Sequence, residues 1–393
     1  MKYRLDERSG NKLSILGFGC MRLPRGVGGI DIPKSEKLIL KAIEAGVNYF
    51  DTAYLYMGSE AALGTVLSKN NVRDKVYLAT KLPIVHCRAN ADFDRFMEAQ
   101  LAALSTDYFD YYLMHNINSL AQWKKMCDLG ICEWISGKKA SGKLRQIGFS
   151  FHGAKDEFVQ VLNAYDWDFC QIQYNYANEH YQAGVDGLTL AAAKHIPVVI
   201  MEPLLGGKLA NGLSRAAVDV FTKANAAYSP AAWSLRWLWN QPEVTVVLSG
   251  MNEDAQLEDN VATADLCEPN MLTENEKSAY EKVVALFKST DKVPCTGCSY
   301  CMPCPQGVNI PACFASYNAS YTHGRITSLV MYTTSTAANR EGNSLASRCV
   351  DCGKCQRLCP QKIEIGRELK AVKRRLEPFW FHAAMKIMRK RTK

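Results

Sequence analysis

Two short runs of cysteine in the last quarter of the chain have the spacing of metal-cluster ligands. The second run reads Cys349-x2-Cys352-x2-Cys355-x3-Cys359-Pro360. Three thiolates at this turn spacing let one short loop surround three corners of a cubic [4Fe–4S] cluster, while the fourth binds a neighbouring cluster. Zinc is the alternative, but zinc sites usually separate two Cys-x2-Cys pairs by a longer connection. The run therefore predicts an iron–sulfur site.

The first run is an internal repeat of the second, one residue shorter in its last gap. It is followed by CPQGVNIP at 304–311, which matches CPQKIEIG at 359–366. The repeat resembles two-cluster bacterial ferredoxins, in which each run gives its fourth cysteine to the other cluster. That resemblance implies two [4Fe–4S] clusters, one held by Cys295, Cys298, Cys301 and Cys359, the other by Cys349, Cys352, Cys355 and Cys304. The short gap leaves Cys313 as an alternative to Cys304.

A second group of polar residues follows three predicted strands in the first half of the chain. Asp51 closes VNYF, Lys81 closes VYLAT and His115 closes FDYYLM, while Tyr56 lies in the segment after Asp51. The carboxyl ends of the strands form the active-site face of a (β/α)8 barrel. We therefore expect the four side chains to lie in one cleft. Each alone has an ordinary explanation as an ion pair or packing residue, but their joint order favours catalysis.

The elements that would hold these residues alternate between strand and helix over the first 265 residues. Apolar runs predict strands at 15–20, 47–52, 76–81, 109–115, 145–150, 169–174, 197–202 and 244–250. Helical patterns lie between them, such as 35–46 with Ser35 as its N-cap. Eight such units favour an α/β protein with a (β/α)8 TIM barrel. The doubly wound alternative is disfavoured because the early glycines lack the G-x-G-x-x-G spacing.

Composition divides the chain into three parts. A last helix at 273–289 begins with the capping box of Thr273 and Glu276, and the cysteine-rich segment follows. We therefore expect a barrel at 1–290, a small ferredoxin-like iron–sulfur domain at 291–366 and a basic tail at 367–393. The tail contains ten Lys and Arg and two acidic residues, a net charge equal to the +8 of the whole chain.

Acidic and basic residues balance to a net charge of about zero over residues 1–366, which argues against a nucleic-acid-binding surface. The tail could attract an acidic electron carrier or an anionic membrane surface, although a solvated tail with packed aromatic residues is the simpler interpretation. No apolar run reaches the roughly 20 residues of a transmembrane helix, and MKYRLDERSG lacks the apolar stretch of a signal peptide. Clustered thiols point to metal rather than disulfides, so we expect a cytoplasmic protein.

Three segments, DTAYLYMGSE (51–60), ATK (79–81) and LMH (113–115), resemble the signature segments of the aldo-keto reductase family. The resemblance covers roughly residues 1–265, and the cysteine-rich module resembles members with a ferredoxin-type extension.

The resemblance implies an oxidoreductase that interconverts a small-molecule carbonyl and alcohol. Tyr56 would be the general acid and base, with its pKa lowered by Lys81. Asp51 would hold Lys81, and His115 would orient the carbonyl.

The same resemblance implies a nicotinamide site. Its residues would be Ser150 and Gln171 at the carboxamide, Met201 at the ring, Leu205 and Gly207 at the pyrophosphate, and Asn260 at the adenine end. The segment 249–260 has four acidic residues and no Lys or Arg, whereas a 2′-phosphate is usually bound by Arg or Lys. NADH is therefore favoured over NADPH; weak nicotinamide binding and a flavin are alternatives.

Hydride transfer moves two electrons, whereas an iron–sulfur cluster normally passes one, so a flavin could convert between the two. The clusters could exchange electrons with a ferredoxin or flavodoxin, or they could stabilise a small domain that has little core. We expect an enzyme of an anaerobe. The alternative is an electron-transfer or redox-sensing protein whose barrel is a cofactor-binding scaffold without turnover.

Overall fold

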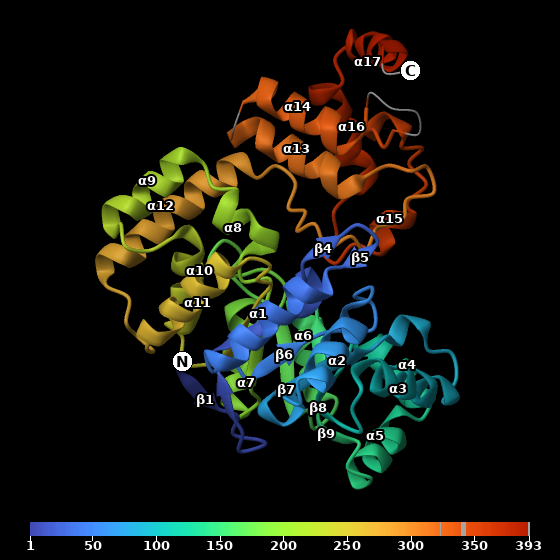
Figure 1. Ribbon diagram of the computed structural model, residues 1–393, viewed down its shortest axis with the longest axis vertical. Coiled ribbons are helices and arrows are strands. Elements are labelled where there is room, and N and C mark those ends of the chain that lie inside the picture. The colour runs from blue at the N-terminus through green and yellow to red at the C-terminus, as the bar shows by residue number, and fades with distance from the viewer. Residues whose placement is uncertain (323, 339–342, 392–393) are drawn as a thin grey trace. The chain divides into compact units, whose positions relative to one another are not determined.

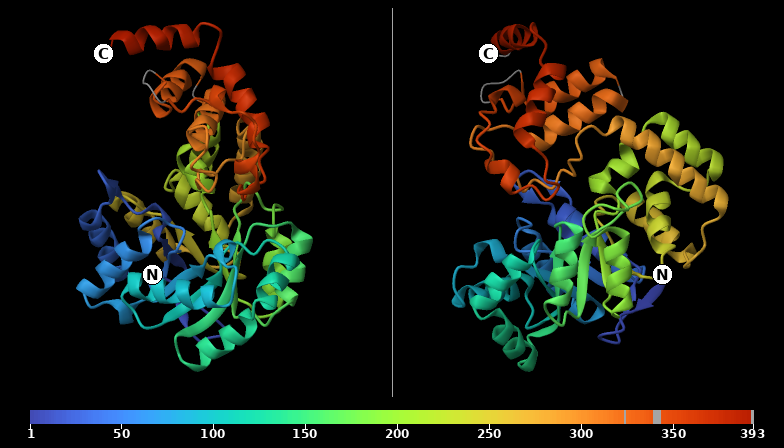
Figure 2. Two further views of the ribbon diagram at one scale, coloured as in Figure 1. Left: turned by 90° about the vertical axis from the view of Figure 1, so that its right-hand side faces the viewer. Right: turned by 180° about the vertical axis from the view of Figure 1, so that it is seen from behind.

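The computed structural model describes residues 1–322, 324–338 and 343–391, and the chain forms two compact units (Figures 1 and 2). The first comprises Met1–Pro203 and Ala231–Leu272, and the second comprises Leu204–Pro230 and Thr273–Lys393. The second unit thus includes a segment from the middle of the chain as well as the cysteine-rich part.

Eight parallel strands close into a barrel in the first unit. They are β3 (Leu16–Gly19), β6 (Tyr49–Asp51), β7 (Tyr77–Leu82), β8 (Phe109–Met114), β9 (Leu144–Phe151), β10 (Phe169–Gln173), β11 (Val198–Met201) and β12 (Val244–Ser249). Consecutive strands pair in parallel, and β12 pairs with β3 to close the ring. The predicted (β/α)8 barrel and each of its strands are confirmed.

Helices surround these strands (Figures 1 and 2). They are α1 (Ile32–Glu44), α2 (Ser59–Lys69), α3 (Ala91–Leu104), α4 (Leu120–Asp128), α5 (Ile131–Ala140), α6 (Lys155–Asn163), α7 (Gly184–Ala193), α10 (Pro230–Trp239) and α11 (Asp254–Leu266). The prediction that Ser35 caps α1 is wrong. Asp31 is the N-cap and accepts a hydrogen bond from the Lys34 amide at 3.0 Å, while the Ser35 hydroxyl donates to the Asp31 carbonyl one turn back.

Side chains fill the barrel interior, so the barrel is a packed core. Tyr49, Tyr111, Phe169 and Val246 are fully buried in one cluster there. A larger cluster lies between strands and helices. Two antiparallel hairpins were not expected: β1 (Tyr3–Leu5) with β2 (Lys12–Ser14), and β4 (Arg25–Gly26) with β5 (Gly29–Ile30). Short 3-10 turns are η1 (Cys20–Arg22), η2 (Arg73–Lys75), η3 (Ile84–His86), η4 (Leu205–Gly207) and η5 (Ala346–Arg348).

The described part of the second unit is helical. Its helices are α8 (Lys208–Asn211), α9 (Arg215–Ala224), α12 (Glu274–Thr290), α13 (Ile310–Thr322), α14 (Arg325–Ser335), α15 (Lys354–Arg357), α16 (Ile365–Leu376) and α17 (Phe381–Arg391). The capping box of Thr273 and Glu276 is confirmed at the start of α12, which packs on α9. Helices α13, α14 and α16 lie side by side (Figure 1) around a core that includes Phe314, Tyr332 and Leu369.

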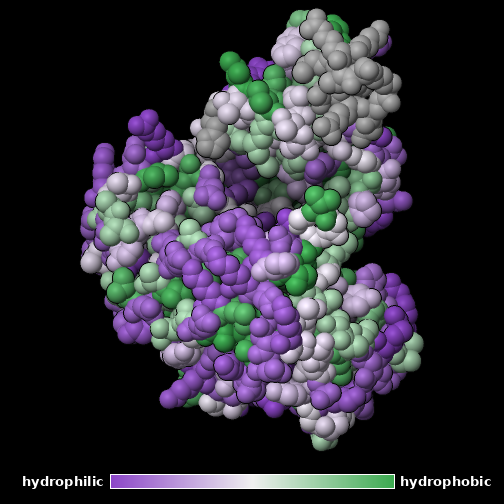
Figure 3. Space-filling view, in the orientation of Figure 1, coloured by the Kyte–Doolittle hydropathy of each residue, from purple (hydrophilic) through white to green (hydrophobic). Residues whose placement is uncertain are grey.

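The predicted tail 367–393 forms part of α16 and α17, while residues 392–393 lie outside the described residues. Phe381 is buried against Tyr332, and Phe379 is exposed. Among the described residues, no helix combines the length and hydrophobicity needed to cross a bilayer. On the face shown in Figure 3, hydrophilic residues predominate and hydrophobic ones form small, separate patches.

Candidate active site and cysteine pockets

A buried lysine lies between a carboxylate and a tyrosine where β6 and β7 end. Lys81 Nζ is 2.6 Å from Asp51 Oδ1, 2.8 Å from the Thr52 carbonyl oxygen and 3.5 Å from the Tyr56 hydroxyl oxygen. Burial lowers the pKa of Lys81, and the charge and hydrogen bond of Asp51 oppose that shift. Asp51 therefore helps to retain a positive charge beside the tyrosine oxygen.

Tyr56 is brought back to Lys81 by the tight turn that follows β6. Its amide donates to the Ala53 carbonyl at 2.9 Å, and the Ser59 amide donates to the Tyr56 carbonyl at the start of α2. Lys81 Nζ also lies 4.9 Å from the centre of the Tyr56 ring. The hydroxyl is thus held next to the lysine by backbone geometry as well as by the side-chain contact.

His115 follows β8 and is nearly fully buried. Its ring centre is 6.0 Å from that of Tyr56, and the two rings are perpendicular. Burial lowers the pKa of His115 well below its usual range, and Lys81 and His152 shift it in the same direction. The imidazole is therefore neutral at neutral pH and offers one donor and one acceptor nitrogen. The structure brings together all four residues predicted from the strand ends.

Two residues that were predicted to contact the nicotinamide carboxamide, Gln171 and Ser150, lie at the same end of the barrel. Gln171 Nε2 donates to Asp51 Oδ2 at 3.0 Å, so both oxygens of Asp51 accept hydrogen bonds. Ser150 Oγ accepts from the Asn116 amide at 2.9 Å. Both side chains are buried, and these contacts fix their positions.

Two further buried polar residues at this end of the barrel were not predicted from the sequence. Gln173 is two residues beyond Gln171 on the same face of β10, and neither its Nε2 nor its Oε1 has a protein partner among the residues that the structure describes. The alternation of glutamines in CQIQY was the available signal. His152 follows β9, and its Nδ1 is 3.2 Å from Gln182 Oε1. Nothing in the sequence distinguishes this histidine from a structural one.

The remaining predicted nucleotide contacts are divided between the units. Met201 and Asn260 belong to the first unit, and Leu205 and Gly207, in the turn η4, belong to the second. Asn260 is buried on α11 and its Nδ2 donates to Ser249 Oγ at 2.9 Å.

The acidic residues at the start of α11 form ion pairs with lysines of α1. Glu253 pairs with Lys34 at 2.8 Å, and Asp254 pairs with Lys37 at 2.6 Å. Lys41 contacts both Asp254 and Glu258. The acidic residues noted in the segment 249–260 therefore serve, at least in part, to join these two helices.

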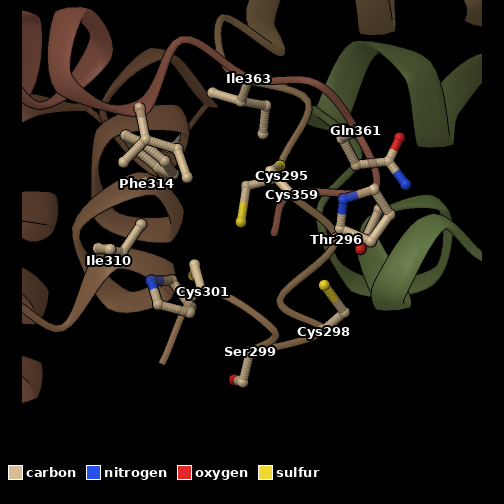
Figure 4. Close-up of a pocket in the computed structure, with 13 residues that line it drawn as sticks. Cys295, Thr296, Cys298, Ser299, Cys301, Ile310, Phe314, Cys359, Gln361 and Ile363 are labelled. Atoms are coloured by element: carbon tan, nitrogen blue, oxygen red, sulfur yellow. The ribbon is translucent and has the colours of Figure 1, made fainter. Parts of the chain in front are cut away.

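The lining of the first cysteine pocket includes Cys295, Cys298, Cys301 and Cys359. Figure 4 shows these side chains around it, with Ile310 and Phe314 along one side. Three cysteines come from the first run and the fourth from the second run. The loop that holds Cys295 and Cys298 lies close to η4, since the Thr296 carbonyl directly faces the Cα of Gly206.

The lining of the second cysteine pocket includes Cys304, Cys349, Cys352 and Cys355. Here the first run supplies one cysteine and the second run supplies three. Ile310 lines both pockets. Cys313 lines neither; it is buried, and its Sγ lies 3.8 Å from the Ser344 carbonyl oxygen.

The sequence of the barrel matches a known family over most of its length. Residues 15–271 match the aldo/keto reductase family. The chain belongs to the aldo/keto reductase family. Residues 294–364 of this aldo/keto reductase match the 4Fe-4S dicluster domain. The C-terminal region is thus an iron–sulfur domain, and its two pockets, each with four thiols and apolar walls, fit a cluster apiece.

Curated relatives share modest identity with this aldo/keto reductase. An aldo-keto reductase of Mycobacterium sp. (strain MCS) is 33% identical over 107 residues, which are 27% of this chain and 35% of that protein. The chain thus spans about a third of the length of the first mycobacterial relatives. A 6-dehydroglucose reductase of Novosphingobium aromaticivorans is 26% identical over 276 residues, which are 65% of this chain and 88% of that protein.

Solved structures share the fold. Aldo-keto reductase AKR11C1 from Bacillus halodurans, in its holo form, aligns with a TM-score of 0.58 and 24% identity, covering 72% of this chain and 96% of that chain. An aldo-keto reductase from Klebsiella pneumoniae in complex with NADPH aligns with a TM-score of 0.61 and 22% identity, covering 72% of this chain and 95% of that chain. At these identities the likeness shows the barrel fold alone.

Proposed function

We propose that this aldo/keto reductase interconverts a carbonyl and an alcohol, with Tyr56 transferring the proton. The observation that carries the proposal is the position of Lys81 Nζ, 2.6 Å from Asp51 and 3.5 Å from the Tyr56 oxygen. A positive charge at this distance stabilises the negative charge that develops on the phenol oxygen as its proton leaves. Asp51, held by Lys81 and Gln171, keeps that charge in place.

A bound nicotinamide would supply or accept the hydride at the carbonyl carbon. Tyr56 would donate its proton to the carbonyl oxygen in reduction and regain it in alcohol oxidation, so the C=O bond becomes CH–OH or the reverse. Neutral His115, perpendicular to the Tyr56 ring, could donate a hydrogen bond to the same oxygen. Deep burial of Lys81, Asp51 and His115 limits access of water to these groups.

The buried amide of Gln173 supports a nicotinamide at this end of the barrel. A buried donor and acceptor without protein partners among the described residues suit a ligand group that both accepts and donates, such as a carboxamide. Ser150 and Gln171 remain the predicted neighbours of that group, and Met201, Leu205, Gly207 and Asn260 the predicted contacts of the rest. We propose NADH, because α11 begins with acidic residues whose lysine partners are engaged in ion pairs.

The proposal is tested by Tyr56→Phe on anaerobically purified holoenzyme, assayed with small aldehydes and alcohols and with NADH and NADPH. General acid–base catalysis typically contributes about 10²–10⁴-fold, so kcat should fall by that factor. Tyr54→Phe is the matched control: Tyr54 lies in the same turn but is 41% exposed, and its ring contacts Phe96. Comparable turnover of Tyr56→Phe and Tyr54→Phe would refute the assignment of Tyr56.

The two cysteine pockets favour a second activity, one-electron transfer. We propose that Cys295, Cys298, Cys301 and Cys359 hold one [4Fe–4S] cluster and that Cys304, Cys349, Cys352 and Cys355 hold the other. The clusters would relay electrons between the enzyme and an external carrier in the cytoplasm, where thiols stay reduced. If the protein instead only senses or transfers electrons, Tyr56→Phe would leave cluster reduction unchanged and no native turnover would be found. The absorbance and mass of the acid-extracted cofactor would show whether the protein binds a flavin that could convert between hydride transfer and one-electron transfer.

A further inference from the structure

The two cysteine pockets differ in their exposure to solvent. All fifteen cysteines are described, and Cys352, in the second pocket, is the exposed one among them. Val350 and Asp351, which line the second pocket beside Cys352, are exposed too, whereas the lining of the first pocket includes the buried Phe314 and Ile363. Electron transfer between proteins requires a close approach of the two redox centres. The second pocket therefore offers the accessible edge of the domain.

The second pocket also has the more positive surroundings. Residues 345–358, which supply three of its cysteines, contain Arg348, Lys354 and Arg357 and one acidic residue, Asp351, whereas residues 291–311, around the first run, contain one lysine and one aspartate. Asp351 pairs with Lys370 at 2.6 Å, and Glu364 pairs with Arg367 at 2.7 Å. The charge of Asp351 is thus offset by Lys370, and Arg367 lies within ion-pair distance of both Glu364 and Glu368.

Exposed apolar and basic side chains lie next to one another in this segment. Val350 and Leu358 are 62% and 57% exposed, and each adjoins a cysteine in sequence. Lys354 and Arg357 of α15 are exposed, and no acidic side chain pairs with either among the described residues. Lys370 is held beside the pocket by its contact with Asp351. An apolar centre with a charged rim is the usual anatomy of a transient protein interface.

We propose that this surface, composed of Val350, Cys352, Lys354, Arg357 and Leu358 and called here the Cys352 face, docks a small acidic one-electron carrier protein. The inference rests on the proposed relay of electrons by the clusters. The cluster held in the second pocket gains one electron while the reduced carrier loses one, and no bond or proton changes. The positive surroundings favour association with a carrier whose surface is negative around its own redox centre.

The same charges have a thermodynamic consequence for the second cluster. Net charge and solvent exposure are among the factors that set cluster reduction potentials. Nearby cations stabilise the more negative, reduced form, so the cluster in the second pocket should have the higher potential of the two. An electron arriving at the Cys352 face would enter this cluster first.

The test measures binding of a small acidic [2Fe–2S] ferredoxin, used as a probe, to the full-length holoprotein by calorimetry at low and high salt. Lys354→Glu with Arg357→Glu should weaken binding at low salt by about 10-fold or more and reduce its salt dependence. Lys124→Glu with Lys125→Glu, an exposed pair on α4 with the same charge change, should leave the affinity within about twofold. Equal weakening by both variants, or by neither, would overturn the proposal.

Two further readouts separate docking from the other roles of the protein. In a redox titration followed by electron paramagnetic resonance, Lys354→Glu with Arg357→Glu should lower the potential of one cluster and leave that of the other nearly unchanged, at full iron content. Tyr56→Phe should bind the ferredoxin with unchanged affinity. A failure of the catalytic proposal can therefore be distinguished from a failure of the docking proposal. Binding to phosphatidylserine vesicles without binding to the ferredoxin would identify a membrane surface as the occupant and contradict a protein carrier.

Discussion

Burial acts in opposite ways on the charged and neutral members of the candidate active site. It penalises the ammonium of Lys81, which stays charged with help from Asp51, and it keeps His115 uncharged. Both effects serve the proposed reaction, which needs a fixed cation beside Tyr56 and a neutral hydrogen-bond donor opposite it. Burial is also the main cause that lowers the pKa of His152, and the hydrogen bond with the Gln182 amide opposes it.

Burial lowers the pKa of His152 to about 4. Below the unfolded value near 6.5 the unfolded chain binds a proton that the folded chain does not, so the free energy of unfolding falls as pH falls from 6.5 towards 4. Between pH 7 and 5 this residue should contribute about 2 kcal/mol of that loss. His152→Gln should therefore reduce the difference in unfolding free energy between the two pH values by about this amount, measured by denaturant unfolding under anaerobic conditions.

His180→Gln is the control for this measurement, because it makes the same substitution at an exposed histidine. An unaltered pH dependence in His152→Gln would show that the buried imidazole is protonated, or released from the core, at a higher pH than its burial implies. His115 is left intact throughout, since it belongs to the proposed catalytic group.

At the scale of elements, the strands were predictable and several boundaries were not. Apolar runs separated by helical patterns are strong signals, and buried parallel strands must be apolar on both faces. The hairpin of β1 and β2 was not predicted, because its strands are three residues long and partly exposed. The start of α1 was misplaced because Asp31 and Ser35 are both good N-caps, and only the backbone geometry shows that Asp31 serves.

The candidate active site also contains residues that were predictable from the sequence and residues that were not. Asp51, Tyr56, Lys81 and His115 were predicted because their positions relative to three strand ends constrain one another. Gln173 was missed because its importance lies in lacking partners among the described residues, which is a property of packing and not of sequence.

Gly206 joins two distant segments of the second unit. Its φ is +70°, and an added Cβ would lie 2.0 Å from the Thr296 carbonyl oxygen, next to Cys295. Gly206→Ala should therefore displace the loop of the first cysteine run, lowering iron content and the thermal unfolding temperature. Gly207→Ala is a matched control, because Gly207 also has a positive φ but has open space around its Cα. It should cost only about 1 kcal/mol of backbone strain.

If Gly206→Ala and Gly207→Ala have equal iron content and equal unfolding temperatures, the close approach of η4 to the cysteine loop does not matter for the second unit. Iron content is the better readout here, since Gly207 is a predicted nucleotide contact and activity would mix two effects.

At the scale of the whole molecule, the chain alternates between its two units. The segment 204–230 leaves the barrel between β11 and α10 and forms part of the second unit before the chain returns. Composition alone could not predict that this segment belongs to the second unit, because it has no cysteine and its sequence resembles that of the other helical segments. The exchange of cysteines between pockets was predictable only through the likeness to two-cluster ferredoxins.

That exchange predicts which cysteine variants affect which cluster. Cys359→Ser should remove the fourth ligand of the first pocket, and Cys304→Ser that of the second, so each variant should lose iron and change the spectrum of a different cluster. Cys313→Ser is the control and should keep the iron and sulfide content of the unmodified protein, because Cys313 lines neither pocket. Iron loss in Cys313→Ser together with full iron in Cys304→Ser would reverse the assignment of that ligand.

The position of Cys359 in the first pocket also constrains events during synthesis. At roughly 5–20 residues per second, the ribosome makes Cys359 several seconds after Cys301. For that interval the nascent chain carries Cys295, Cys298 and Cys301 without the fourth thiol of their pocket. Delivery of iron and sulfide is therefore expected only to a chain that already includes Cys359, and the cell must keep both runs reduced until then.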